Sequence, residues 1–78
     1  MRTNEGYIII KSENIYNDNK GEIVLGYNPK SKMYVTWECQ NKINYFWGHY
    51  IDIEARAVTD YYSRLKEYAE REIENEDI

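Results

Sequence analysis

Cysteine and histidine are the side chains best suited to nucleophilic and acid–base catalysis near neutral pH, and each occurs once in this chain of 78 residues. His49 follows Trp47 and Gly48, where its imidazole could meet an exposed carboxylate for acid–base chemistry. Cys39 has no histidine or aspartate near it in the sequence to activate its thiol. The glycines are isolated and form no phosphate-binding loop before a helix. We therefore expect no enzyme, no metal site and no cofactor.

Acidic residues are concentrated at the C-terminal end of the chain, whose formal net charge is −4. Residues 1–50 contain six basic and five acidic side chains, whereas residues 51–78 contain four basic and nine acidic ones. Lysine and arginine clusters dominate the affinity of proteins for duplex DNA, and this chain has none, so we do not expect it to bind a duplex. We expect instead a protein partner with a basic surface. The carboxylates predicted to contact it are Glu67, Glu70, Glu72 and Glu74.

The first two thirds of the chain have the pattern of β-strands. Branched and aromatic residues between turns that contain Gly, Asn or Pro predict strands over about residues 7–11, 22–28, 33–40 and 44–50. Residues 33–40 alternate strictly, so one set should face the core and the other should form an open face of the sheet. The predicted core set is Met33, Val35, Trp37 and Cys39, and the predicted open set is Tyr34, Thr36, Glu38 and Gln40.

Both faces of the last predicted strand carry aromatic side chains. We assign Tyr45, Trp47 and Ile51 to the core, because they form the larger apolar set, and Phe46 to the open face. Asp52 is a suitable N-cap for the helix that follows. This helix is predicted over about residues 53–74, and the crowded carboxylates beyond it predict an acidic tail at 75–78. The apolar stripe of the helix should contain Ala55, Val58, Tyr62, Leu65 and Ala69.

These elements predict one α+β domain that spans residues 1–78. Its sheet should be a three- or four-stranded antiparallel meander, covered on one face by one long C-terminal helix. No disulfide can form within a chain that has a single cysteine, and no apolar run is long enough for a signal peptide or a membrane span. We therefore expect a cytoplasmic protein with no membrane partner. Nine Tyr, two Trp and one Phe exceed what so small a core can bury, which indicates a binding face or a homodimer interface.

Three segments carry an architectural resemblance that covers about 30 residues. Tyr34-Val35-Thr36-Trp37, Phe46-Trp47-Gly48 and the stretch from Asp52 to Leu65 together resemble the ethylene-response-factor-type domains of plants and the N-terminal domains of some phage and transposon integrases. The resemblance implies a three-stranded sheet with one helix, and in those families the open sheet face reads the major groove with Arg and Trp side chains. The matching face here has no arginine and has Glu38 at its centre, which opposes duplex binding.

Two functions of different classes fit these features. The first is a non-catalytic protein-binding module in which the acidic helix and the exposed aromatics Tyr34 and Phe46 contact a basic partner. In size and charge the chain resembles small phage or mobile-element proteins that inhibit nucleic-acid-handling defence systems, including anti-CRISPR proteins, and such a protein would act as a DNA mimic. The alternative is a single-stranded nucleic-acid binder that stacks bases on Tyr34 and Phe46. The lysines predicted to follow its phosphates are Lys30, Lys32 and Lys42.

Overall fold

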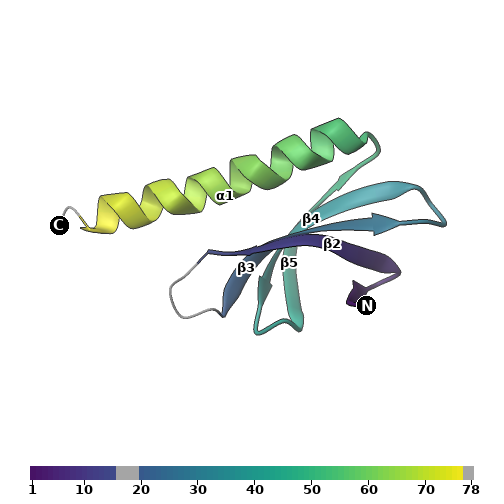
Figure 1. Ribbon diagram of the computed structural model, residues 1–78, viewed down its shortest axis with the longest axis horizontal. Helices are drawn as coiled ribbons and strands as arrows, with labels where there is room; N and C mark the ends of the chain where they lie inside the picture. Colours follow the sequence, from purple (N-terminus) through teal and green to yellow (C-terminus); the bar gives the residue numbers. More distant parts are fainter. Residues whose placement is uncertain (16–19, 77–78) are drawn as a thin grey trace.

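The computed structural model describes residues 1–15 and 20–76, with side chains up to Glu70, and shows five strands followed by one helix (Figure 1). The strands pair antiparallel in chain order, β1-β2-β3-β4-β5, so the sheet is a meander. The predicted α+β class is confirmed, but the sheet has five strands rather than three or four. The elements are β1 (Thr3–Asn4), β2 (Tyr7–Asn14), β3 (Gly21–Asn28), β4 (Met33–Gln40), β5 (Asn44–Ile51) and α1 (Glu54–Glu76).

Two differences explain the extra strand and the longer elements. Glu5 and Gly6 both adopt positive φ in a tight turn, which lets the two residues of β1 pair with the start of β2. β2 continues to Asn14 rather than ending near residue 11. Its polar residues from Lys11 to Asn14 are exposed, and they pair with β3. Residues 75–76 of the predicted tail continue α1, and residues 77–78 lie outside the described part of the chain.

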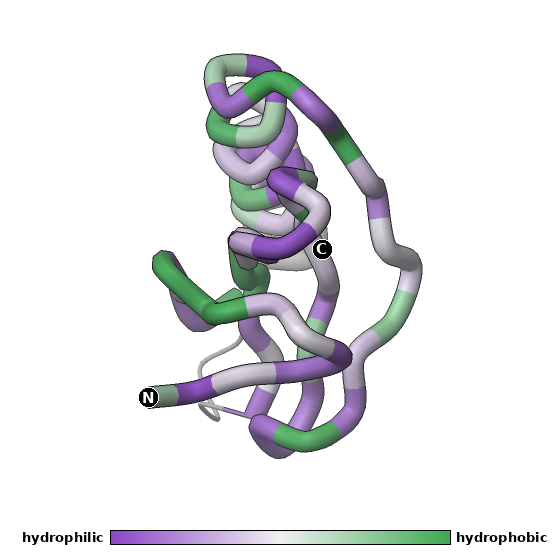
Figure 2. The backbone as a smooth tube through the Cα atoms, turned by 90° about the vertical axis from the view of Figure 1, so that its right-hand side faces the viewer, coloured by the Kyte–Doolittle hydropathy of each residue, from purple (hydrophilic) through white to green (hydrophobic). Residues whose placement is uncertain are grey.

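The helix covers one face of the sheet at β3 and β4, and its C-terminal end projects beyond the strands (Figure 1). Viewed along the helix, the strands curve past it rather than forming a flat layer (Figure 2). The molecule is therefore elongated, with extents of 47 × 24 × 17 Å. The side chains buried between α1 and the sheet are Ile15, Ile23, Leu25, Ala57 and Tyr61.

The helix packs on the opposite face of β4 from the one predicted. Tyr34 donates a hydrogen bond to Glu54 Oε2 at 3.3 Å, and Thr36 donates one to Asp60. Tyr68 donates to the carboxylate of Glu38, which is buried. Tyr34, Thr36 and Glu38, which were expected on an open face, therefore lie under α1, because polar groups of the helix satisfy their hydrogen bonds there. Gln40 and Phe46, expected on the same face, are exposed.

The helix is rotated accordingly from its predicted orientation. Ala57 and Tyr61 are buried against the sheet, whereas Ala55, Tyr62 and Ala69 of the predicted stripe are exposed. Val58 and Leu65 of that stripe pack against the core as predicted. The helix also begins one residue later than expected. The carbonyl of Ile53 accepts the first backbone bonds, from Arg56 and Ala57, so Ile53 occupies the N-cap position that was predicted for Asp52.

A second apolar cluster fills the face of the sheet that lies away from α1. It contains Val24, Val35, Trp37 and Cys39 and is completed by Tyr7, Ile9 and Tyr45. The Trp37 ring makes edge contacts with Tyr7 at 5.5 Å and Tyr45 at 5.2 Å between ring centroids. Val35, Trp37 and Cys39 of the predicted core set are thus buried, but by the curled sheet and not by the helix, whereas Met33 is only half-buried.

Arg2 closes the edge of this second cluster. Its guanidinium pairs with Glu22 at 2.5 Å and donates to the hydroxyl of Tyr45 at 3.0 Å. Burial raises the pKa of the Cys39 thiol beneath it, which makes this sulfur a weak nucleophile. No helix in the described part of the chain is long and apolar enough to span a membrane.

Candidate functional site

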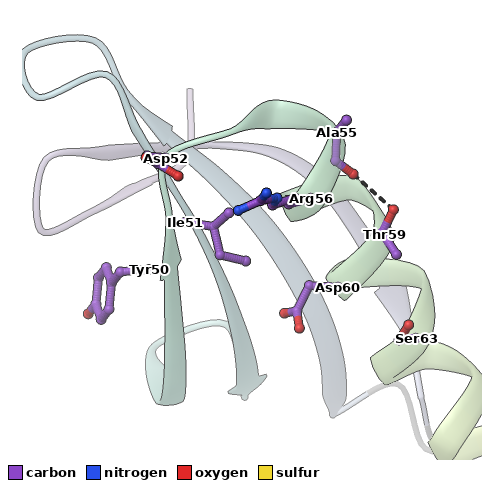
Figure 3. A pocket seen from close by; sticks show the side chains of 8 residues that line it. All are labelled: Tyr50, Ile51, Asp52, Ala55, Arg56, Thr59, Asp60 and Ser63. Carbon is purple, nitrogen blue, oxygen red and sulfur yellow. Dashed lines mark hydrogen bonds between the residues drawn. The ribbon is translucent and has the colours of Figure 1, made fainter.

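A concave surface lies between the edge strand β5 and the helix α1, and we call it the β5–α1 groove. It consists of two adjoining hollows that share Asp60 and Ser63. The first has a volume of about 630 Å³, and Figure 3 labels the eight residues that line it. Asp60 and Arg56 point from the helix toward β5, whereas Tyr50 points to the other side of the strand (Figure 3). The second hollow, of about 400 Å³, is lined by Trp47, His49, Asp60, Ser63, Arg64, Glu67 and Tyr68.

A β-bulge shapes the rim of the second hollow. Thr36 pairs with His49 and Glu38 pairs with Phe46, so Trp37 faces two residues of β5, Trp47 and Gly48. A side chain at position 48 could not fit, because its Cβ would lie 2.7 Å from Nε1 of Trp37. The bulge reverses the side-chain alternation along the strand.

The reversal corrects the prediction for β5. Tyr45 lies on the Trp37 side of the sheet, and Ile51 packs toward α1, so the three residues assigned to one core face do not share it. Trp47 does not enter the core at all and is 69% exposed. Phe46 lies beside it, 40% exposed, with 5.8 Å between the ring centroids. Trp47 is the only non-glycine residue within a described strand that has positive φ, at 51°.

A polar network fixes the helix against β4 and β5 beneath the groove. His49 Nδ1 lies 2.9 Å from Asp60 Oδ2, and the same carboxylate accepts from Thr36. Nη1 of Arg64 donates to the carbonyl oxygens of Thr36 and Trp47 at 3.1 and 2.9 Å. The network therefore holds the bulged segment at a fixed distance from α1.

The network also has the geometry of an acid–base pair, because Asp60 orients the imidazole of His49. Ser63 lines the same groove, but no hydrogen bond joins it to His49 among the described residues. Cys39 lies on the opposite face of the sheet, in the second apolar cluster. The described residues contain no group of three or more His, Cys, Asp or Glu side chains that could hold a metal ion. The arrangement can orient a ligand, but it presents no activated nucleophile.

Of the predicted protein-binding residues whose side chains are described, Glu67 lines the β5–α1 groove, whereas Tyr34, Phe46 and Glu70 do not. Glu67 lines the second hollow with Trp47. Glu70 lies on the same helix outside the lining and is 3.9 Å from Lys66. Glu72 and Glu74 belong to α1, but their side chains lie outside the described part.

The residues predicted for nucleic-acid binding are spread over the molecule. Lys30 and Lys32 lie in the turn between β3 and β4, and Lys42 lies in the turn between β4 and β5. These turns are at opposite ends of β4. Tyr34 is half-buried beside the start of α1, and desolvation, together with the nearby Glu54 carboxylate, raises the pKa of its phenol. Tyr34 and Phe46 therefore do not form one open aromatic face.

Sequence reasoning missed Trp47, Asp60 and Arg64 as site residues. The signal that could have identified Trp47 is Gly48, since a glycine inside an aromatic strand often marks a bulge. Asp60 and Arg64 are four residues apart, a spacing that predicts an ion pair within the helix. In the structure they form hydrogen bonds to the sheet instead.

Replacement of Trp47 by glycine should leave the stability unchanged or raise it by up to about 1 kcal/mol, because glycine adopts positive φ without a Cβ clash. Urea unfolding measures the effect. Trp47→Val is the matched control, since it also removes the indole but keeps a branched Cβ at this φ. We expect the valine variant to be the less stable of the two, and the reverse order would contradict the strained backbone at the bulge.

Comparison with known proteins gives no family for this chain. No family model matches it, and neither does any curated protein or solved structure at a significant level. The function proposed below is therefore argued from the geometry and charge of the β5–α1 groove.

Proposed function

We propose that this protein is a non-catalytic protein-binding module and that the β5–α1 groove is its contact surface. The observation that supports this most strongly is Trp47. A large aromatic side chain is held in solvent at the rim of a hollow, on a backbone conformation that costs about 1–2 kcal/mol for a residue with a Cβ. Tryptophan is the residue type most enriched among the energetic centres of protein interfaces.

Neighbouring residues extend the apolar surface along β5. Ile43 and Phe46 are exposed together with Trp47, and all three lie on or just before the edge strand. Tyr50 is exposed as well, but its ring packs on Tyr7 and Trp37 on the other side of the sheet. Scattered apolar side chains are normal on a protein surface, but several on one strand beside a groove are typical of an interaction site. The rigid network of Asp60 and Arg64 beneath them lowers the entropy lost on binding.

The charge of the helix favours a basic partner. Glu67 and Glu70 are exposed on α1, and the C-terminal end of the chain is strongly acidic. A nucleic-acid-handling enzyme presents such a basic surface, so a phage or mobile-element inhibitor of a defence system stays our prediction for the biological role. Size and charge support that role.

Site-specific photo-crosslinking tests the proposal. A benzophenone amino acid at position 47 should capture a discrete protein from nuclease-treated bacterial lysate. The matched control places it at position 62, because Tyr62 is an exposed aromatic on α1 outside the groove. Capture at 47 and not at 62 is the expected result. Equal capture at both positions, or none at 47, would contradict a groove-centred interface, and an adduct of twice the chain mass would identify a homodimer.

The adjacent rings of Phe46 and Trp47 also favour one second candidate, stacking of unpaired bases. Oligothymidylate should then shift the fluorescence of Trp47, and the shift should disappear as salt rises. Absence of any shift at low salt would remove this candidate.

A further inference from the structure

We propose that the second hollow of the β5–α1 groove receives an arginine side chain of the partner protein. The guanidinium would stack on the indole of Trp47 and pair with the carboxylate of Glu67. This inference rests on the proposed function, because it specifies the chemistry of the partner at the same surface.

The charge of the hollow favours a cation. Its lining contains two carboxylates, Asp60 and Glu67, one guanidinium, that of Arg64, and the imidazole of His49. Asp60 already contacts His49 and Thr36, so Glu67 is the carboxylate left for a ligand. Arg64 is occupied by the hydrogen bonds of its Nη1 to Thr36 and Trp47, and it contributes to holding the bulge in place. Glu67 is exposed and forms no ion pair with any side chain that the structure describes. The carboxylate of Glu67 can therefore accept hydrogen bonds from a bound guanidinium.

The indole supplies the second half of the recognition. Trp47 is the better of the exposed rings for a cation–π contact, because tryptophan has the strongest π-face of the aromatic side chains. A guanidinium is planar and weakly hydrated, so it can stack on the ring while its N–H groups donate to a carboxylate in the same plane. The volume of about 400 Å³ falls within the range of about 300–1,000 Å³ found for ligand sites.

The shape of β5 favours insertion of a side chain over addition of a strand. The bulge at Trp47 and Gly48 interrupts the outer edge beside the hollow, and the Trp47 carbonyl is already bonded to Arg64. An extended partner segment could not form a continuous ladder there. At longer range, the net charge of −4 attracts a basic partner and speeds the encounter.

A capped pentapeptide with one arginine between glycines tests the proposed site. The uncharged control is the same peptide with citrulline in place of the arginine. The indole N–H signal of Trp47 reports binding by NMR at low salt, and the backbone amide signal of Val24, which is buried in β3 and lines neither hollow, serves as an internal reference. The arginine peptide should shift the Trp47 signal, with at least about tenfold weaker binding of the citrulline peptide.

Two variants with the same change in net charge separate local from global electrostatics. Glu67→Gln should weaken binding of the arginine peptide by about fivefold to tenfold, whereas Glu70→Gln, outside the hollow, should change it by less than about twofold. Equal effects of the two variants, equal binding of the two peptides, or no shift with either would overturn the arginine site. Crosslinking at position 47 would still decide the proposed function, so the two failures are distinguishable.

Discussion

Trp37→Ala is expected to lower the free energy of unfolding by about 3–5 kcal/mol, the largest effect of any single substitution considered for this chain. Trp37 is 3% exposed and lies at the centre of the apolar cluster that faces away from the helix. Its ring contacts Tyr7, Tyr45 and Tyr50, which come from two different strands. Removal of the indole would leave a cavity that these rings cannot close without giving up their own packing.

A chain of 78 residues has a total stability of about 4–12 kcal/mol, so this variant should be largely unfolded or melt far below the parent. Urea unfolding followed by circular dichroism measures the loss. Trp47→Ala is the matched control, because the same side chain is removed from a position that is 69% exposed. If both variants melted alike, the burial assigned to the two tryptophans would be wrong.

Arg2→Met should cost about 3 kcal/mol, because it leaves the carboxylate of Glu22 buried without its main partner. Glu22 has only 5% of its side chain exposed, and Arg2 lies 2.5 Å from it. The cost stays at the lower end of the range for broken buried pairs for two reasons. Arg2 is itself 26% exposed, and Lys42 approaches Glu22 to 4.0 Å.

The double variant Arg2→Met with Glu22→Leu should recover most of that loss, since a buried ion pair can be replaced by apolar side chains at little cost. Unfolding of the parent, both single variants and the double variant gives the coupling energy between the two side chains. Strictly additive losses would show that Arg2 stabilises the fold through its contact with Tyr45 rather than through the ion pair.

Sequence patterns that depend on neighbouring residues predicted the fold well. The bounds of β4 follow from strict alternation between two turns, and α1 follows from its helical spacing. β1 was missed because two residues carry no periodic signal. The face of the sheet covered by α1 was wrong because β4 is buried on both sides, so alternation distinguishes two faces without saying which one the helix takes.

The candidate site was predicted only in part for a similar reason. Glu67 was found because acidic charge on a helix is visible in the sequence. Trp47 was placed in the core because strict alternation from Tyr45 takes no account of the bulge. The bulge packs Gly48 against the ring of Trp37, which is distant in the sequence, so no local pattern records it. The His49–Asp60 contact likewise depends on how α1 docks, which no local pattern records.

The two bulges have a consequence for how this protein behaves when it is concentrated. β2, which pairs with the two-residue β1 only at Tyr7 and Ile8, carries an extra residue between Ile9 and Lys11, and the edge strand β5 carries one at Trp47, so both strands are kinked. A straight, unpaired strand rich in apolar residues recruits further copies edge to edge and seeds fibrils. Here the exposed Ile10 and Trp47 both lie at the kinks, where backbone pairing between copies is interrupted. The chain can thus expose apolar side chains to a partner while its kinked strands do not pair with the strands of other copies.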